Sequence, residues 1–207
     1  MGQRFELSDN RSLQLAEVAE VTARSVRFRL LEPVAFEEPP LRVTLVASLI
    51  KFDRFEWMVE KATELGVEAI LPVASERSEA GLLEAARKRV ERWRRIARES
   101  SEQSRRVRMP EIRPAGRLAD VSAGDFAWRL CLDEDPATPP LAHSLPPAGE
   151  SGVMAILTGP EGGWTAAERN LLRLSWTPVS MGRQILRAET AVIAALAVMM
   201  NCGAREA

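Results

Sequence analysis

The 207-residue sequence predicts an α/β fold with a mainly parallel sheet. Three observations support this prediction. Strand, helix and strand follow one another between residues 42 and 73, and two later apolar strands, at 153–158 and 178–181, each lead through a glycine-containing loop into a helix. Loops at the carboxyl ends of neighbouring parallel strands face one crevice, so we expect a ligand site between the last two loops.

The composition is typical of a globular protein. Hydrophobic residues make up 46% of the chain, and 28 basic against 29 acidic residues give a net charge of −1, so the average charge does not indicate a polyanionic partner. The cysteines, Cys131 and Cys202, are far apart, and with a single histidine, His143, the sequence predicts no metal. No secretory signal is evident and the apolar run 191–200 is half of the ~20 residues that a membrane helix needs, so we expect no membrane partner and a cytoplasmic location.

The N-terminal segment reads as a separate unit. Residues 13–21 and 25–31 have the alternation of two short strands on either side of a turn. Two strands are too few for an independent core. The charged, proline-containing stretch Glu32–Pro40 follows, and it predicts a boundary between a first domain, 1–36, and a second domain, 41–207.

The second domain opens with the strand–helix–strand unit. A helix is predicted from Asp53 to Gly66, between strands at 42–50 and 67–73. Asp53 is expected to cap the first turn with Glu56 as its capping-box partner. Gly66 is expected to end the helix in a left-handed conformation.

The remaining elements continue the α/β pattern. A long helix is predicted from Gly81 to about Gln103, and Thr165 with Glu168 forms a capping box before another helix. The last helix, Ala188–Asn201, is apolar all round and requires burial in a core or a subunit interface. Strands are predicted at 126–132, 153–158 and 178–181, with a proline-rich loop from 135 to 151.

The glycine-rich stretch "LTGPEGGW", Leu157–Trp164, matches neither nucleotide fingerprint. It lacks the lysine and hydroxyl residue of a P-loop and the GxGxxG of a dinucleotide site. Glu161 disfavours an anionic ligand and tolerates a neutral or cationic one. On local evidence the stretch is equally well a tight turn.

A second segment, "MGRQILRAETA" from Met181 to Ala191, favours a ligand site. It again places a short strand and a glycine before a helix, and Arg187, Glu189 and Thr190 lie at the helix entrance. Taken singly, these three side chains are explained by capping and ion pairing. Two such loops at one crevice are better explained by a bound ligand.

The two motifs together resemble the RsmE family of SPOUT methyltransferases. "LTGPEGGWTAAE" is followed about twenty residues later by "MGRQILRAETA", and further matches are "KFDRFEWMVEKATELGV" from Lys51, "ERS" at 76–78 and "ESSEQSRRVRMPEI" from Glu99. The resemblance extends from about Leu41 to Ala207. It implies S-adenosylmethionine-dependent methylation of N3 of a uridine in 16S ribosomal RNA.

The resemblance also implies a fold and a cofactor site. The C-terminal part would be tied in a trefoil knot that binds bent S-adenosylmethionine, and two subunits of a homodimer would build each site. Glycines would let main-chain groups approach the adenine. The implied cofactor-binding residues are Leu132, Leu157, Thr158, Gly159, Pro160, Glu161, Gly162, Gly163, Met181, Gly182, Ile185, Leu186, Arg187, Thr190 and Ala191.

The N-terminus departs from the family pattern. Members of the family have a PUA-like β-barrel, but residues 1–36 match its last strands, beginning near "GQRFELSDNRS" at Gly2. The expectation is therefore a truncated PUA-like RNA-binding segment, or a reduced domain, with the truncated form favoured by its unpartnered strands.

A basic segment runs from Arg87 to Arg108, with ten basic residues against three acids. It is explained either by a solvated helix face with ion pairs such as Glu91–Arg95, or by RNA contact. The resemblance favours RNA, with ribosomal RNA in the assembled 30S subunit as the partner. The implied RNA-binding residues are Arg77, Arg98, Gln103 and Arg106, and Arg105 stands where the family usually has glycine.

The chemistry assigns two catalytic candidates. Methyl transfer to uracil N3 requires loss of a proton, and the negative charge spreads to the carbonyl oxygens. Arg187 is the candidate that stabilises this charge, and Glu189 is the candidate general base or a group that positions Arg187. The alternatives are a methyltransferase acting on another RNA such as transfer RNA, a different nucleotide-dependent enzyme, and a non-catalytic RNA-binding or ribosome-assembly module.

Overall fold

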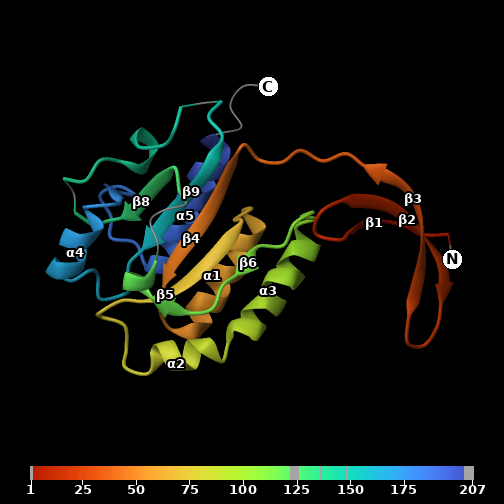
Figure 1. The fold of residues 1–207 in the computed structure, drawn as a ribbon, viewed down its shortest axis with the longest axis horizontal. Helices are drawn as coiled ribbons and strands as arrows, with labels where there is room; N and C mark the ends of the chain where they lie inside the picture. The colour runs from red at the N-terminus through yellow and green to blue at the C-terminus, as the bar shows by residue number, and fades with distance from the viewer. Residues whose placement is uncertain (1, 122–125, 136, 148, 203–207) are drawn as a thin grey trace.

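The computed structural model describes residues 2–121, 126–135, 137–147 and 149–202. A small antiparallel sheet extends from an α/β body, to which residues 35–40 connect it (Figure 1). The last strand of the small sheet ends at Val34, and the first strand of the body begins at Leu41.

The N-terminal sheet has three strands, one more than the sequence predicted. They are β1 (Arg4–Ser8), β2 (Leu13–Val21) and β3 (Val26–Val34), in the order β1-β2-β3. Ala16 and Val18 are buried in it, whereas several other apolar side chains are exposed. The sheet is attached to the body near residue 109, where the Met109 amide donates to Oδ1 of Asn10 at 2.6 Å.

The body contains a parallel sheet, as predicted. Its strands follow the order β10-β8-β9-β4-β5-β6, with β7 also paired to β5, and every pairing is parallel. The bounds are β4 (Leu41–Ser48), β5 (Ala69–Ala74), β6 (Glu111–Ile112), β7 (Gly116–Arg117), β8 (Trp128–Leu132), β9 (Gly152–Thr158) and β10 (Thr177–Val179).

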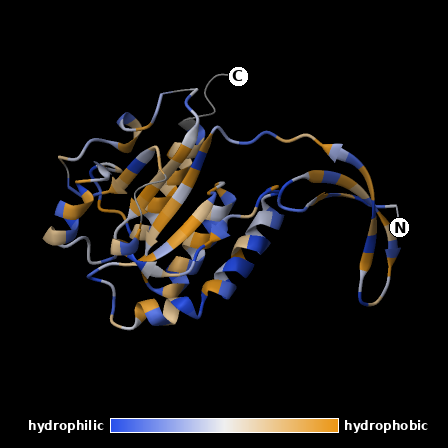
Figure 2. Cartoon of the chain, viewed as in Figure 1, coloured by the Kyte–Doolittle hydropathy of each residue, from blue (hydrophilic) through white to orange (hydrophobic). Residues whose placement is uncertain are grey.

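Helices cover both faces of this sheet. Successive strand residues point to opposite faces; Leu45 and Ile156 belong to a core with α1, α3 and α5, whereas Val46 and Leu157 pack with Trp164 and residues of α4. Figure 2 shows the apolar strands between these layers. The helices are α1 (Phe52–Glu64), α2 (Leu82–Arg87), α3 (Val90–Gln103), α4 (Ala166–Leu172) and α5 (Ala188–Cys202), with short 3-10 turns at Leu118–Asp120 and Leu141–His143.

The predicted cap of α1 is wrong. Lys51 occupies the N-cap position without a side-chain cap bond, and Asp53 lies in the first turn. Glu56 instead accepts hydrogen bonds from Arg92 of α3 at 2.7 Å and from Arg89 at 3.0 Å. The Glu56 carboxylate, which the sequence pattern assigned to the capping box, therefore forms an ion pair with α3 and its preceding residue instead. The left-handed Gly66 after the helix is confirmed, with φ of +97°.

The long helix predicted from 81 to 103 is interrupted at Lys88 and Arg89. The first part, α2, contacts β5, and the second part, α3, contacts α1. Trp93 anchors α3 because its ring is fully buried, with its centroid 4.5 Å from that of Phe55. The break turns the chain between these two packing partners.

The apolar helix α5 is buried on one side and half-buried on the other. Val192, Ala195, Leu196 and Met199 are buried in the core, while Ile193 and its neighbours along the helix are partly exposed. Within the described part of the chain, no helix combines the length and apolar character needed to cross a membrane.

Candidate functional site

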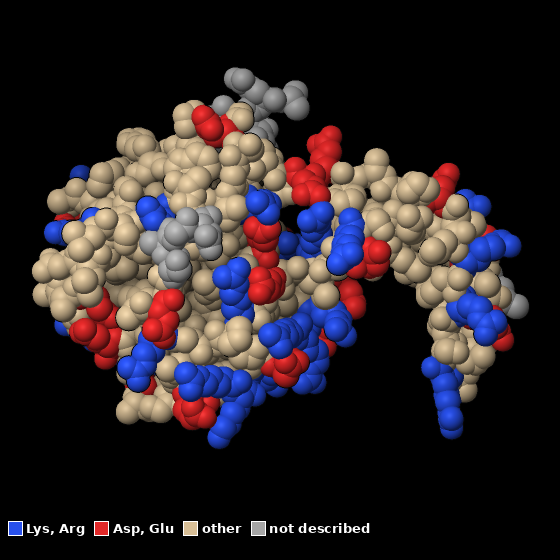
Figure 3. All heavy atoms as spheres, viewed as in Figure 1, with Lys and Arg blue, Asp and Glu red and all other residues tan. Residues whose placement is uncertain are grey.

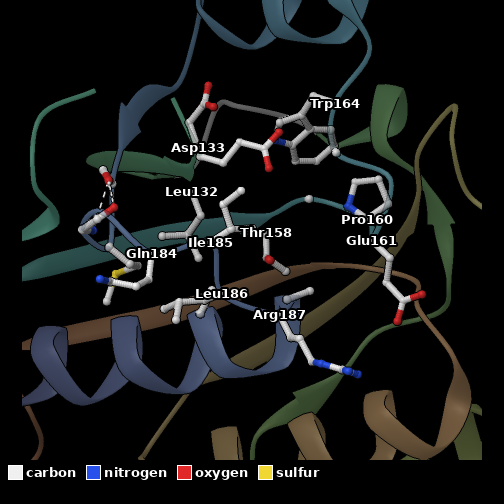
Figure 4. A pocket seen from close by; sticks show the side chains of 18 of the residues that line it. Leu132, Asp133, Thr158, Pro160, Glu161, Trp164, Gln184, Ile185, Leu186 and Arg187 are labelled. Carbon is white, nitrogen blue, oxygen red and sulfur yellow. Dashed lines mark hydrogen bonds between the residues drawn. The ribbon is translucent and has the colours of Figure 1, made fainter. Parts of the chain in front are cut away.

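A pocket of about 330 Å³ lies at the carboxyl ends of β8, β9 and β10 (Figure 4). This volume is within the roughly 300–1,000 Å³ of small-molecule sites. The loops after β9 and β10 form two walls, as the sequence predicted. Strand β8 lies between those two strands and adds a third wall, Leu132–Glu134.

Most of the expected cofactor residues line this pocket. They are Leu132, Thr158, Gly159, Pro160, Glu161, Gly163, Met181, Gly182, Ile185, Leu186, Arg187 and Ala191. Leu157, Gly162 and Thr190 are not among the lining residues. The Leu157 side chain points into the core on the α4 face, and Thr190 is exposed on α5.

The glycine loop, Gly159–Gly163, has a conformation that its sequence explains. Gly163 adopts φ of +67°, and its amide donates to the carbonyl of Pro160 at 2.9 Å. A Cβ built at Gly159 would come within 3.1 Å of the Trp164 ring, which packs directly against the loop. The predicted capping box is confirmed, with the Thr165 side chain accepting from the Glu168 amide at 3.1 Å.

A neighbouring loop after β5 holds the glycine loop from outside the pocket. Arg77 donates to the carbonyl of Gly162 at 2.6 Å. The amide of Glu76 donates to Glu168 at 2.8 Å, and the Thr165 hydroxyl donates to Glu76 at 2.7 Å. The loop after β5 therefore holds both the glycine loop and the start of α4, through residues about ninety positions away in sequence.

The second loop, from Ser180 to Arg187, supplies apolar side chains and a cation. The Gly182 amide donates to Oγ of Ser180 at 3.1 Å, and Gly182 has φ of +115°. Ile185 is 81% exposed beside the pocket. Arg187 is exposed at the pocket, and no polar partner for its guanidinium is found within the described residues.

Two arginines neutralise the acidic groups of the pocket. Arg54 of α1 pairs with Glu161, and its Nε lies 3.8 Å from Oε1 of Glu189. Arg169 of α4 pairs with Asp133 at 2.9 Å and with Glu134 at 3.2 Å. Because the Glu161 carboxylate is already paired, its charge repels an anionic ligand less than the sequence alone suggested.

Comparison with known proteins assigns the chain to a family. The sequence model of a protein family, described as RNA methyltransferase domain, matches residues 37–200. The chain is 37% identical to ribosomal RNA small subunit methyltransferase E of Synechocystis sp. over 89% of this chain and 60% of the relative, and 32% identical to that of Bacillus subtilis over 78% and 66%. The structure of the Neisseria gonorrhoeae protein of that name, bound to S-adenosylmethionine, superposes with a TM-score of 0.84 and 30% identity over 97% of this chain and 83% of the other.

The chain belongs to the RsmE family. It spans 60% of the length of the Synechocystis relative and 66% of that of the Bacillus relative.

Sequence reasoning missed several residues that line the pocket of this RsmE-family chain. Asp133 and Glu134 directly follow β8, and their position at a strand end was a usable signal. Arg54 lies in the first motif of the family resemblance, but the primary sequence shows nothing that places it at the glycine loop. The missed lining residues are Arg54, Asp133, Glu134, Trp164, Arg169, Ser180, Gln184 and Ala188.

The four expected RNA-binding residues lie in different environments. Arg77 binds the glycine loop, whereas Arg98 and Gln103 are exposed on α3. Arg106 is largely buried, and its guanidinium donates to the carbonyls of Thr63, Gly66 and Val67 at the end of α1. Burial lowers the pKa of Arg106 to about 10, so it remains charged at neutral pH as a cap of that helix.

Other reactive side chains lie outside the pocket wall. Burial raises the pKa of the Cys131 thiol to about 12, which makes it an inert core residue. His143 is exposed in a 3-10 turn. Across the described residues, no cluster of three or more His, Cys, Asp or Glu side chains is arranged to hold a metal ion.

Proposed function

We propose that this chain catalyses S-adenosylmethionine-dependent methylation of N3 of a uridine in 16S ribosomal RNA. The observation that carries the proposal is the pocket between two glycine loops in a chain of the RsmE family. The Neisseria gonorrhoeae protein, with the same family name and a similar structure, binds S-adenosylmethionine. The substrate, small-subunit ribosomal RNA, follows from the names of the relatives.

The residues of the pocket fit this cofactor. Leu132, Ile185 and Leu186 offer apolar side chains to an adenine face (Figure 4). The loop backbones offer amides and carbonyls to its polar edge. A Cβ at Gly182 would meet no atom within 4 Å, so the chain leaves open space at that point. When bound, S-adenosylmethionine supplies a methyl group on a positively charged sulfur.

Arg187 is the proposed electrostatic catalyst. Arg187 lines the pocket edge with an exposed side chain, and its guanidinium has no acidic partner among the described residues. A cation in this position stabilises the negative charge that develops on the uracil oxygens as N3 loses its proton. The charge is available to a ligand because none of the ion pairs among the described residues involves Arg187.

Glu189 is the proposed second catalytic group, either as the base that accepts the N3 proton or as a group that positions its neighbours. Glu189 is 8% exposed and lies in the first turn of α5. It is not a lining residue, and Arg54 stands between its Oε1 and the glycine loop. This arrangement supports positioning better than direct proton transfer.

The RNA is proposed to bind the basic surface of α2 and α3. Figure 3 shows lysine and arginine side chains gathered over these helices. Arg98 is part of this surface, and Gln103 lies at its end. Residues 1–36 are proposed to be part of a PUA-like RNA-binding domain, since β1, β2 and β3 form a separate antiparallel sheet.

The C-terminal region is proposed to form a SPOUT-type trefoil knot and a homodimer interface. The pocket is lined by the loops after three successive strands, β8, β9 and β10, in the C-terminal region where the family resemblance places the knotted cofactor site. The half-buried apolar side of α5, including Ile193, supports burial against a second subunit. A cytoplasmic location is proposed because the relatives act on ribosomal RNA.

Titration calorimetry with S-adenosylmethionine, ATP and NAD tests the proposal. We expect binding heat with S-adenosylmethionine and none with the other two. Heat with ATP or NAD instead would indicate another nucleotide-dependent enzyme, and no heat with any of them would indicate a non-catalytic RNA-binding module. The substrate is tested by mass spectrometry of 16S ribosomal RNA nucleosides from a deletion strain, where unchanged 3-methyluridine would contradict the substrate assignment and direct attention to transfer RNA.

A further inference from the structure

Arg54 lies where three elements of the body meet. It belongs to the first turn of α1, pairs through Nη1 with Glu161 of the glycine loop, and lies through Nε 3.8 Å from Glu189 of α5. The glycine loop and the segment leading into α5 are two walls of the pocket, and Arg54 itself lines it. One guanidinium therefore connects both walls to α1.

Burial makes Glu189 dependent on this cation. Its side chain is 11% exposed, and Oε2 is buried with no hydrogen-bond donor among the described residues. A buried carboxylate without a compensating cation is costly. Among the described cations, Arg54 is the one that forms an ion pair with it.

The fold does not require Arg54 for its packing. Contact between α1 and its neighbours comes from fully buried apolar residues such as Phe55, Met58 and Ala62. The Arg54 side chain is 30% exposed at the pocket, outside that core. Its two acidic partners belong to the ligand-binding elements, so its contacts serve the pocket rather than the helix.

We propose that Arg54 is a positioning residue that holds the glycine loop against the first turn of α5. It pairs with Glu161 on one side and neutralises Glu189 on the other, and so keeps the pocket walls at the separation seen in the structure. The inference rests on the proposed function, because it names S-adenosylmethionine as the ligand that this separation fits. Without Arg54, Glu161 is free to turn into solvent and Glu189 is left as an uncompensated charge beneath the pocket.

The test compares Arg54→Ala and Arg54→Lys with the unaltered protein. Loss of a charge-assisted bridge is expected to weaken S-adenosylmethionine binding about tenfold, read as a rise in Kd by calorimetry and in KM for the cofactor, with a smaller change in kcat. Arg54→Lys retains the charge, but an ammonium group cannot contact both carboxylates as a guanidinium does. We therefore expect its affinity for S-adenosylmethionine to lie between those of Arg54→Ala and the unaltered protein. Arg42→Ala is the matched control, because it also removes an ion pair from the protein surface. Arg42 lies 3.0 Å from Glu68, and neither residue lines the pocket.

A double-variant cycle identifies the route of the effect. If Arg54 acts by holding Glu161, then Arg54→Ala combined with Glu161→Gln weakens binding no more than the stronger single change. Additive losses would contradict the proposed link to the glycine loop. Unchanged cofactor binding in Arg54→Ala, at a melting temperature equal to that of Arg42→Ala, would overturn the inference altogether.

Hydrogen exchange separates this inference from the proposed function. The amide of Gly163, which donates to the carbonyl of Pro160, is expected to exchange faster in Arg54→Ala than in Arg42→Ala, without any cofactor present. If the unaltered protein does not bind S-adenosylmethionine but the loop loosens, the proposed function fails while the positioning role of Arg54 stands. If the loop exchanges at the same rate in both variants, the positioning role fails, whatever the protein binds.

Discussion

Arg187 and Glu189 are two positions apart in sequence, yet the structure gives them different environments. Arg187 is exposed at the pocket, while Glu189 is buried and adjoins Arg54. From the sequence, Arg187 is the candidate for charge stabilisation, and Glu189 is the candidate base or a group that positions Arg187. The start of α5 thus carries one exposed side chain at the pocket edge and one buried side chain two positions later.

Replacement of Arg187 by alanine is expected to lower kcat about 10²–10³-fold, the loss typical of removing one preorganised donor from a charge-stabilising site. Single-turnover methylation with saturating RNA and cofactor measures this loss. Arg183→Ala is the control, because Arg183 is exposed on the same segment but does not line the pocket. Normal turnover in Arg187→Ala would refute the assigned role.

At the scale of an element, the end of α3 has an arginine in a backbone conformation that favours glycine. Arg105 has φ of +56°, the left-handed conformation that glycine adopts at little cost. The amide of Arg106 donates to Ser101 at 2.9 Å and that of Arg105 to Glu102 at 3.4 Å, which are the two bonds of a Schellman motif. The turn thus keeps the conformation expected of glycine, with an arginine in its place.

Arg105→Gly is therefore expected to raise the free energy of unfolding by about 1 kcal/mol, since it removes the clash of Cβ in the left-handed region. Urea denaturation monitored by circular dichroism measures the change. Arg105→Ala removes the same charge but keeps Cβ, so it should give no comparable gain. Equal stabilisation by both variants would show that charge, and not backbone conformation, limits stability at this turn.

Across the whole molecule, the tertiary structure determines which charges are available to a partner. Most of the basic side chains from Arg87 to Arg108 bind other groups of the protein. Arg89 and Arg92 form ion pairs with Glu56, and Arg106 donates to the carbonyl of Thr63 in α1. The predicted Glu91–Arg95 pair is not formed, because Glu91 binds Arg94. Basic residues of this segment without a side-chain polar partner among the described residues are Lys88, Arg95, Arg98 and Arg105.

RNA binding should depend on these unpaired cations. In the double variant Arg95→Ala/Arg98→Ala, we expect the slope of log K against log salt concentration to fall by roughly 1.5, at about 0.7–0.9 per lost phosphate contact. Filter binding at a series of salt concentrations measures the slope. Arg92→Ala is the control on the same helix, because Arg92 already forms an ion pair with Glu56. If this single change lowered the slope by half as much as the double variant, the distinction between paired and unpaired arginines would be contradicted.

The sequence by itself determined the α/β class, the parallel strands and most of the pocket wall. These features depend on local patterns, such as apolar strands, the Thr165–Glu168 capping box and glycines at strand ends, which act over a few residues. The tertiary structure decided the cap of α1, the break before α3 and the environments of Glu161, Glu189 and Arg106. Arginines from other segments pair with Glu56, Glu161 and Glu189, backbone carbonyls near the end of α1 hold Arg106, and different packing partners separate α2 from α3. A charge pattern in the sequence allows many such pairs until the packed sheet and helices bring one pair together.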